Sequence, residues 1–272
     1  AEGGNAAAAR SLSSFYMTGA GVPQDNHEAA RWLRIAAEAG NVDAQVDVGN
    51  DLLERAVRGE ECPPVADWFM NTAQRGNLVA AFNLGVCLLQ GIGVERNEQQ
   101  AAVWLRRAAE GVPEAQFMIG RLFADGRGVP ADLKAARGWF ARAAEGGITD
   151  AQVALAEMLV NGRGGPQDTP AALKLCEQAA AKDHAGAMFA LGAMYSGGHA
   201  IAVDRAKAEH WFRAAAERGH GQAQLMLGRY LRSGAAGHSD PKEASYWLEL
   251  AVAQGVVDAD AELAELTRTA SR

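Results

Sequence analysis

The chain of 272 residues lacks the features of several protein classes. It has only three cysteines, Cys62, Cys87 and Cys176, without a CxxC pair or a regular spacing, which argues against a disulfide framework and a zinc site. No apolar run approaches the roughly 18–20 residues that cross a bilayer, so we expect no direct membrane insertion. Acidic residues outnumber basic ones by 33 to 26. Nucleic-acid-binding proteins usually carry a basic face, so nucleic acid is not an expected partner.

Signatures of catalysis are also missing. The sequence contains no GxSxG, no HExxH and no GxxxxGK[ST] phosphate loop. The histidines His184, His199, His220 and His238 fall in separate segments at unlike positions, so they are interpreted as solvated loop residues. We therefore predict no enzyme activity, no cofactor and no metal site in this chain.

A repeat of 36 residues runs through the sequence. The tryptophans recur at spacings of 36, 36, 35, 72 and 36 residues, where 72 is two periods. They are Trp32, Trp68, Trp104, Trp139, Trp211 and Trp247, and each ring is expected to fill the space between neighbouring hairpins. A second series, here called the leucine series, lies twenty residues before each tryptophan position and comprises Leu12, Val48, Leu84, Ile119, Leu155, Leu191 and Leu227. Each of its members is preceded, four residues earlier, by an alanine.

Each repeat is expected to form two helices. In residues 79–112, Ala80, Leu84 and Leu88 recur every four residues and so share one helical face. A glycine-rich connector at 91–94 then ends the first helix. Asn97 is a suitable N-cap for the second helix. Aspartate stands at that capping position in other repeats, as Asp25, Asp132, Asp168, Asp204 and Asp240.

These residues carry a resemblance to the Sel1-like repeat of the tetratricopeptide-like superfamily. The fourth repeat shows nearly the whole pattern, from Ala115 and Ile119-Gly120 through Asp132 to Trp139 and Gly147. The resemblance implies an all-α fold, a right-handed α-solenoid of about seven two-helix repeats with a C-terminal capping helix. It also implies an adaptor role. The β-lactam-binding branch of the family has a regular cysteine pair that this chain lacks, so that activity is not expected here.

The second and fifth repeats depart from the pattern. In the second repeat the connector glycines are replaced by Arg55 and Val57, and Pro63-Pro64 fits the first turn of the next helix. The fifth repeat has Leu175-Cys176 in place of tryptophan and an aromatic or aliphatic residue, and Asp183 in place of the closing glycine. Each departure is interpreted either as tolerated variation or as a functional change, in loop shape or in local curvature.

The repeats set the expected domain boundaries. We predict one Sel1-like domain over residues 1–272, with repeats at 6–41, 42–77, 78–112, 113–148, 149–184, 185–220 and 221–256 and a cap at 257–272. Residues 1–5 match the tail of a repeat, like residues 37–41 one period later, which suggests excision from a longer chain. They lack the basic and apolar regions of a signal peptide, and a bacterial cytoplasmic or periplasmic location is expected.

A protein or peptide is the expected partner, bound on a concave face formed by the first helices. Residues two and six positions beyond the leucine series should point into this groove, because i and i+4 share a helical face. The predicted partner-binding residues are Asn50, Glu54, Gln90, Arg121, Asp125, Glu157, Asn161 and Arg229. The alternative is a recognition or regulatory module of a larger enzyme or of an envelope or polysaccharide biosynthetic complex. The sequence gives no indication of the oligomeric state.

Overall fold

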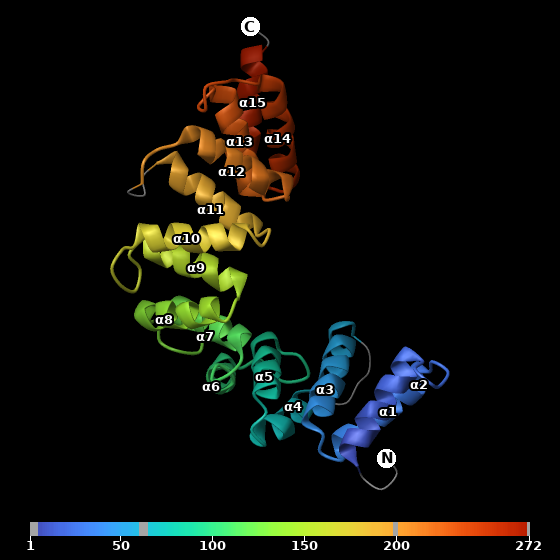
Figure 1. Ribbon diagram of the computed structural model, residues 1–272. Helices are drawn as coiled ribbons and strands as arrows, with labels where there is room; N and C mark the ends of the chain where they lie inside the picture. Colours follow the sequence, from blue (N-terminus) through green and yellow to red (C-terminus); the bar gives the residue numbers. More distant parts are fainter. Residues whose placement is uncertain (1–4, 60–64, 198–200, 271–272) are drawn as a thin grey trace. The chain divides into compact units, whose positions relative to one another are not determined.

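The computed structural model describes residues 5–59, 65–197 and 201–270. Within these ranges the regular structure is entirely α-helical and comprises fifteen helices, which confirms the predicted fold class (Figure 1). No helix in this part of the chain is both long and apolar enough to cross a membrane. Cys62, His199 and the Pro63-Pro64 pair lie outside the described residues.

The helices belong to two compact units, Ala1–Asp132 and Leu133–Arg272. The first unit contains α1 (Ala6–Thr18), α2 (Asn26–Glu38), α3 (Val42–Val57), α4 (Val65–Gln74), α5 (Leu78–Gln90), α6 (Glu98–Ala108) and α7 (Pro113–Asp125). The second unit contains α8 (Leu133–Glu145), α9 (Thr149–Val160), α10 (Thr169–Ala180), α11 (Ala185–Ser196), α12 (Arg205–Glu217), α13 (Gly221–Ser233), α14 (Pro241–Ala253) and α15 (Ala259–Ala270).

Within each unit, helices that follow one another pack together as stacked hairpins. In the second unit every helix from α8 to α15 contacts the next one along the chain. The first helices of neighbouring hairpins also touch, as α3 does with α5, α9 with α11 and α13 with α15. The alanines that stand four residues before the leucine series permit close approach, because their side chains are too small to hold the helices apart. Six of these alanines are fully buried: Ala44, Ala80, Ala115, Ala151, Ala187 and Ala223.

Short polar side chains begin the second helices as the sequence predicted. Asp25, Asp168, Asp204 and Asp240 each accept a hydrogen bond from a backbone N–H in the first turn of the following helix, and so does Asn97. These bonds satisfy N–H groups that have no partner inside a helix.

The tryptophans are less buried than expected. We expected each ring to fill the space between hairpins, but only Trp247 is classed as buried and the others are half-buried. The position after the tryptophan supplies the core residue instead: Phe69, Leu105, Phe212 and Leu248 are fully buried. Some tryptophan rings stack with arginines, such as Arg142, whose guanidinium carbon lies 4.9 Å from the ring centre of Trp139.

The buried residue after the tryptophan faces a glycine that follows the leucine series. A Cβ atom built on Gly85 would lie 2.6 Å from Leu105, and one built on Gly228 would lie 2.7 Å from Leu248. Gly49 meets Phe69 and Gly192 meets Phe212 in the same manner. Each of these hairpins therefore combines a large residue on one helix with no side chain on the other. We call these two residues the hairpin pair.

The second repeat shows what its missing glycines do. The helix α3 continues to Val57 and has 16 residues, whereas α1, α5 and α7 have 13 residues each and end at a left-handed glycine. Because positions 55 and 57 are not glycine, the helix cannot end there in a left-handed conformation without steric strain. Residues 42–59 and 65–77 still provide a pair of packed helices, α3 and α4.

Candidate partner-binding face

The first-helix face is the solvent-exposed side of α1, α3, α5 and α7 in the first unit and of α9, α11 and α13 in the second. Seven of the eight predicted partner-binding residues are exposed on it, and Arg229 is half-buried. The exposed ones are Asn50, Glu54, Gln90, Arg121, Asp125, Glu157 and Asn161.

Some of these side chains also bind neighbouring residues of the chain. Glu54 forms an ion pair with Arg58 one turn later. Arg121 lies over the ring of Phe117. Asn161 donates to the backbone oxygen of Glu157 over 2.9 Å. These local contacts are exposed and therefore leave the groups accessible.

Polar side chains link adjacent first helices with a constant offset of 33 residues, one helical turn short of a repeat. The Nη1 atom of Arg10 donates to Asp43 over 2.8 Å, and Asn83 donates to Asn50 over 2.8 Å. The same relation joins Arg229 to Glu262 over 2.7 Å and Arg232 to Glu265 over 2.6 Å. Asn50 and Arg229, predicted as partner-binding residues, therefore also hold neighbouring hairpins together.

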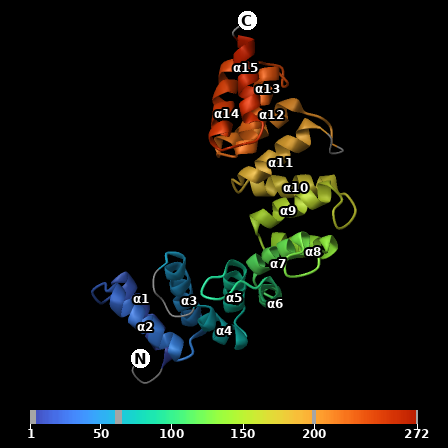
Figure 2. The same cartoon turned by 180° about the vertical axis from the view of Figure 1, so that it is seen from behind.

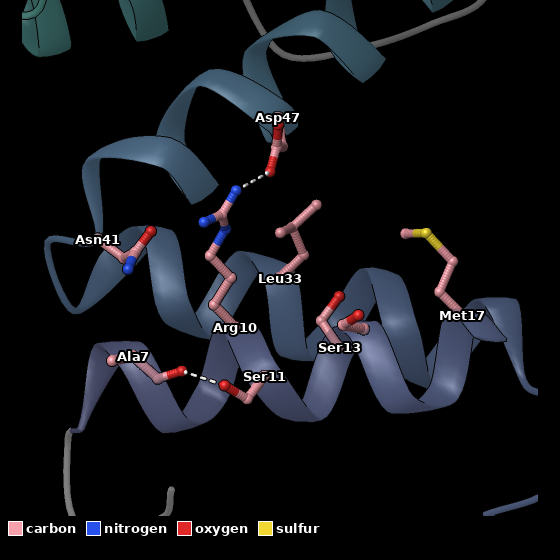
Figure 3. A pocket seen from close by; sticks show the side chains of 9 residues that line it. Ala7, Arg10, Ser11, Ser13, Met17, Leu33, Asn41 and Asp47 are labelled. Atoms are coloured by element: carbon pink, nitrogen blue, oxygen red, sulfur yellow. Dashed lines mark hydrogen bonds and ion pairs between the residues drawn. The ribbon is translucent and has the colours of Figure 1, made fainter. Parts of the chain in front are cut away.

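A first groove lies between α1 and α3, above α2, and has a volume of about 550 Å³ (Figure 3). Its lining comprises Ala7, Arg10, Ser11, Ser13, Ser14, Met17, Leu33, Asn41 and Asp47. Arg10 extends across the groove to Asp43 and Asp47. Serines and this ion-paired arginine give the groove a substantial polar part.

A second groove lies at the equivalent place in the second unit, between α9 and α11 and above α10, and has a volume of about 280 Å³. The three helices lie side by side when the chain is viewed from behind (Figure 2). The lining comprises Val153, Ala156, Glu157, Val160, Asn161, Cys176, Gly186, Phe189, Ala190, Ala193 and Met194. Two predicted partner-binding residues, Glu157 and Asn161, thus lie at one mainly apolar groove.

Sequence reasoning missed the groove itself, although a signal for it was present. In other hairpins the hairpin pair is a glycine with a phenylalanine or a leucine. In the α9–α10 hairpin the two residues are Ala156 and Cys176, and both are small. The signal is Cys176, which replaces the large residue of this pair while the facing residue, Ala156, is also small. The two small residues together leave space above α10.

The buried thiols are poor nucleophiles. Burial raises the pKa of Cys176 to about 12 and that of Cys87 to about 11. Because the thiolate is the reactive form, neither residue is suited to nucleophilic chemistry near neutral pH. Among the residues that the structure describes, no group of three or more histidine, cysteine, aspartate or glutamate side chains is arranged to hold a metal ion.

Two histidines have a structural role that the sequence interpretation got wrong. His184 and His220 lie at equivalent positions of successive repeats, 36 residues apart, and each caps a first helix. Their Nδ1 atoms accept hydrogen bonds from the N–H groups of Ala187 and Ala223. Both are half-buried, and His220 stacks on Phe189 with ring centres 4.7 Å apart. They are therefore capping residues, whereas His238 is an exposed loop residue.

The repeats match a known family. The profile of the Sel1 repeat matches residues 6–41, 78–111, 113–148, 149–184, 185–220 and 221–256, most of the chain. The chain belongs to the Sel1 repeat family. It is a tetratricopeptide-like repeat scaffold, a kind of protein that generally mediates protein–protein interaction. The matched ranges do not include residues 42–77, which form the repeat whose connector glycines are replaced.

Two solved structures show the same relationship. The crystal structure of c5321, a protective antigen present in uropathogenic Escherichia coli strains and displaying an SLR fold, is similar with a TM-score of 0.84 and 30% identity. That match covers 97% of this chain and 57% of the antigen chain. A Sel1 repeat protein from Oxalobacter formigenes is similar with a TM-score of 0.73 and 31% identity, over 97% of this chain and 77% of that one.

One curated relative is the chitin synthase regulator SKT5 of Saccharomyces cerevisiae. It is 28% identical over 149 residues, which cover 50% of this chain and 20% of the regulator. The chain thus spans about a fifth of the length of that protein.

Proposed function

We propose that the chain is an adaptor that binds a partner protein or peptide on its first-helix face. The observation that carries this proposal is the groove between α9 and α11, where apolar side chains line a solvent-open depression bordered by Glu157 and Asn161. Concave, mainly apolar sites with a few polar groups are the usual form of binding sites. Mixed polar and apolar grooves on helical scaffolds suit peptide segments.

Site-specific photo-crosslinking tests the location of binding. A photoreactive residue at Asn161 on α9 should trap the partner from an extract of the source cells. The same residue at Lys174, exposed on α10, is the matched control and should trap little. Equal crosslinking from both positions, or crosslinking from α10 alone, would contradict the proposal.

Charge reversal provides a second test on the trapped partner. Arg121→Glu and Glu157→Arg each change an exposed side chain of the first-helix face, so neither should unfold the chain. We expect weaker binding of the partner with an unchanged thermal unfolding curve. Unchanged affinity in both variants would count against this face.

A regulatory module within a biosynthetic complex is the second candidate, and the similarity to a chitin synthase regulator favours it. The two candidates differ in one measurement. If the partner is a polysaccharide synthase and the chain is its regulator, adding the purified chain should change the synthase's rate. Binding without any change of rate supports an adaptor.

A further inference from the structure

The groove between α9 and α11 has the dimensions of a site for one side chain. Its volume of about 280 Å³ lies just below the range of roughly 300–1,000 Å³ typical of pockets for whole small molecules. A bound helix would need several anchors spaced three and four residues apart, whereas an extended segment needs only one here.

Both members of the hairpin pair beneath this groove are small. In the next hairpin the ring of Phe212 fills the volume above Gly192. In the α9–α10 hairpin, Ala156 faces the shorter side chain of Cys176, and the lining between them is Val153, Val160 and parts of α11. The missing volume is therefore open to a side chain supplied from outside.

The acidic side chains beside this groove, Asp150 and Glu157, both belong to α9. The helix α11 contains no charged residue. The side chains of Asp150 and Glu157 are 66% and 63% exposed. Their counterparts within the chain are His184, whose Nε2 lies 2.9 Å from Asp150, and Arg163, whose Nη1 lies 3.4 Å from Glu157. Exposed ion pairs of this kind contribute about 0–1 kcal/mol and are readily exchanged.

The two carboxylates lie seven residues apart on one helical face, a rise of about 10.5 Å. An extended peptide covers this distance with about three to four residues, at roughly 3.3 Å each. Because successive side chains of an extended segment point to opposite faces, basic residues about four positions apart share one face with the residue midway between them. Such basic side chains would meet both carboxylates while the middle residue enters the groove.

We propose, on the basis of the proposed function, that this groove binds an extended peptide segment through one leucine- or phenylalanine-sized side chain flanked by basic residues. The groove between α1 and α3 supplies an internal contrast. There the positions of Val153 and Ala190 are taken by Arg10 and Asp47, which form an ion pair in the space. That groove is more polar and contains this ion pair, so it is not assigned this ligand.

A groove-filling double variant, Ala156→Gly with Cys176→Phe, tests the proposal. It copies the pair Gly192 and Phe212, so the chain's own core provides the template for a folded product. The probe is a fluorescently labelled peptide with leucine midway between two lysines that are about four residues apart, which places all three side chains on one face of the extended segment. We expect its affinity, measured by fluorescence anisotropy, to fall roughly ten-fold or more, as for loss of an apolar group's burial.

Ala193→Arg is a second variant, in case the double variant does not fold. Ala193 is half-buried in the groove lining and belongs to no hairpin pair, so the change blocks the groove and repels lysine without altering the core. Glu157→Gln should slow association of the peptide, and the effect should fade at high salt. A peptide with alanine in place of leucine should bind weakly to every variant.

Unchanged affinity in the folded double variant and in Ala193→Arg would overturn the proposal. A concentration-dependent self-association that the filled groove abolishes would also overturn it, since the occupant would then be a second copy of the chain. If a partner crosslinks at Asn161 but binds the groove-filling variant with unchanged affinity, this inference is refuted. The proposed function would still stand.

Discussion

Gly192 of α11 lies beneath the ring of Phe212 of α12, and the two helices approach closely because Gly192 has no side chain. A Cβ atom at Gly192 would lie 2.5 Å from Cδ1 and 2.6 Å from Cε1 of this ring. Phe212 is fully buried and cannot turn outward without leaving the core. The pair therefore fixes how the two helices of that hairpin meet.

Gly192→Ala should lower the free energy of unfolding by about 1–3 kcal/mol, the cost of overpacking a core. Helix propensity alone favours alanine by about 1 kcal/mol, so a net loss would isolate the clash with Phe212. Gly138→Ala on α8 is the control, because nothing lies within 4 Å of its Cβ position, and it should stabilise the chain. Denaturant unfolding measures the free energy of unfolding of both variants. An equal change in the two variants would contradict the proposed clash with Phe212.

Gly164→Ala should be more harmful than Gly162→Ala. Both glycines have positive φ angles, 72° and 63°, so each alanine costs about 1–2 kcal/mol of backbone strain. Only at Gly164 does the added Cβ also run into a backbone, that of Leu133 at the start of α8. We expect Gly164→Ala to lose about 1–3 kcal/mol more than Gly162→Ala in thermal unfolding. Similar losses would show that the connector is not a packing element.

Asp183→Gly should stabilise the fifth repeat, whereas Asp183→Ala should not. Asp183 takes a left-handed φ of 67° at the position where Gly147 and Gly219 stand in neighbouring repeats. Glycine relieves roughly 1–2 kcal/mol of strain, offset in part by its greater freedom in the unfolded chain. Both variants lose the exposed bond from Nε of Arg218 over 2.5 Å, so the difference between them reports the backbone alone. A more stable alanine variant would contradict this.

The cap at His220 makes stability depend on pH. Burial, together with the charge of His184, holds the pKa of His220 below its ordinary value of 6.5. The folded chain then binds this proton less readily than the unfolded chain. The stabilisation is complete above pH 6.5 and is lost as the pH falls from there through the folded pKa. Thermal unfolding between pH 7.5 and about pH 5 measures the loss.

His220→Asn is the matched control for this titration. Asparagine caps the equivalent helices at Asn5, Asn41 and Asn77 without titrating, and accepts the same type of hydrogen bond. The variant should fold, and its unfolding temperature should fall less steeply with acid. The same steepness in both proteins would assign the pH dependence to other groups.

The repeat, its two helices and the caps were predictable because each rests on residues close together in sequence. Asp25 and Asn97 have short polar side chains directly before helical periodicity, and this local chemistry determines the cap. The tryptophan positions were equally clear, but their burial was overestimated because a spacing cannot tell which of two adjacent residues faces the core. Phe69 and Phe212, next to tryptophans, proved to be the fully buried ones.

The groove between α9 and α11 could not be predicted from the sequence, for a different reason. It depends on Ala156 and Cys176, twenty residues apart, being small at the same time, and on the position of α11 above them. A single departure from the repeat pattern does not show whether its neighbours compensate. The capping role of His184 was hidden in the same way, since histidine is an unusual helix cap and its equivalents are asparagines.

The polar links between successive first helices restrict how such an array changes during evolution. Repeats of this kind arise and disappear by duplication and deletion of whole units. Loss of residues 42–77 would place Val79 and Asn83 where Asp43 and Asp47 now bind Arg10, and the arginine would lose both carboxylates. The hairpin cores are nearly interchangeable, but these surface pairs are not. Hairpins linked in this way are thus matched to the ones that follow them, so exchanging or removing a repeat there would break the pairs.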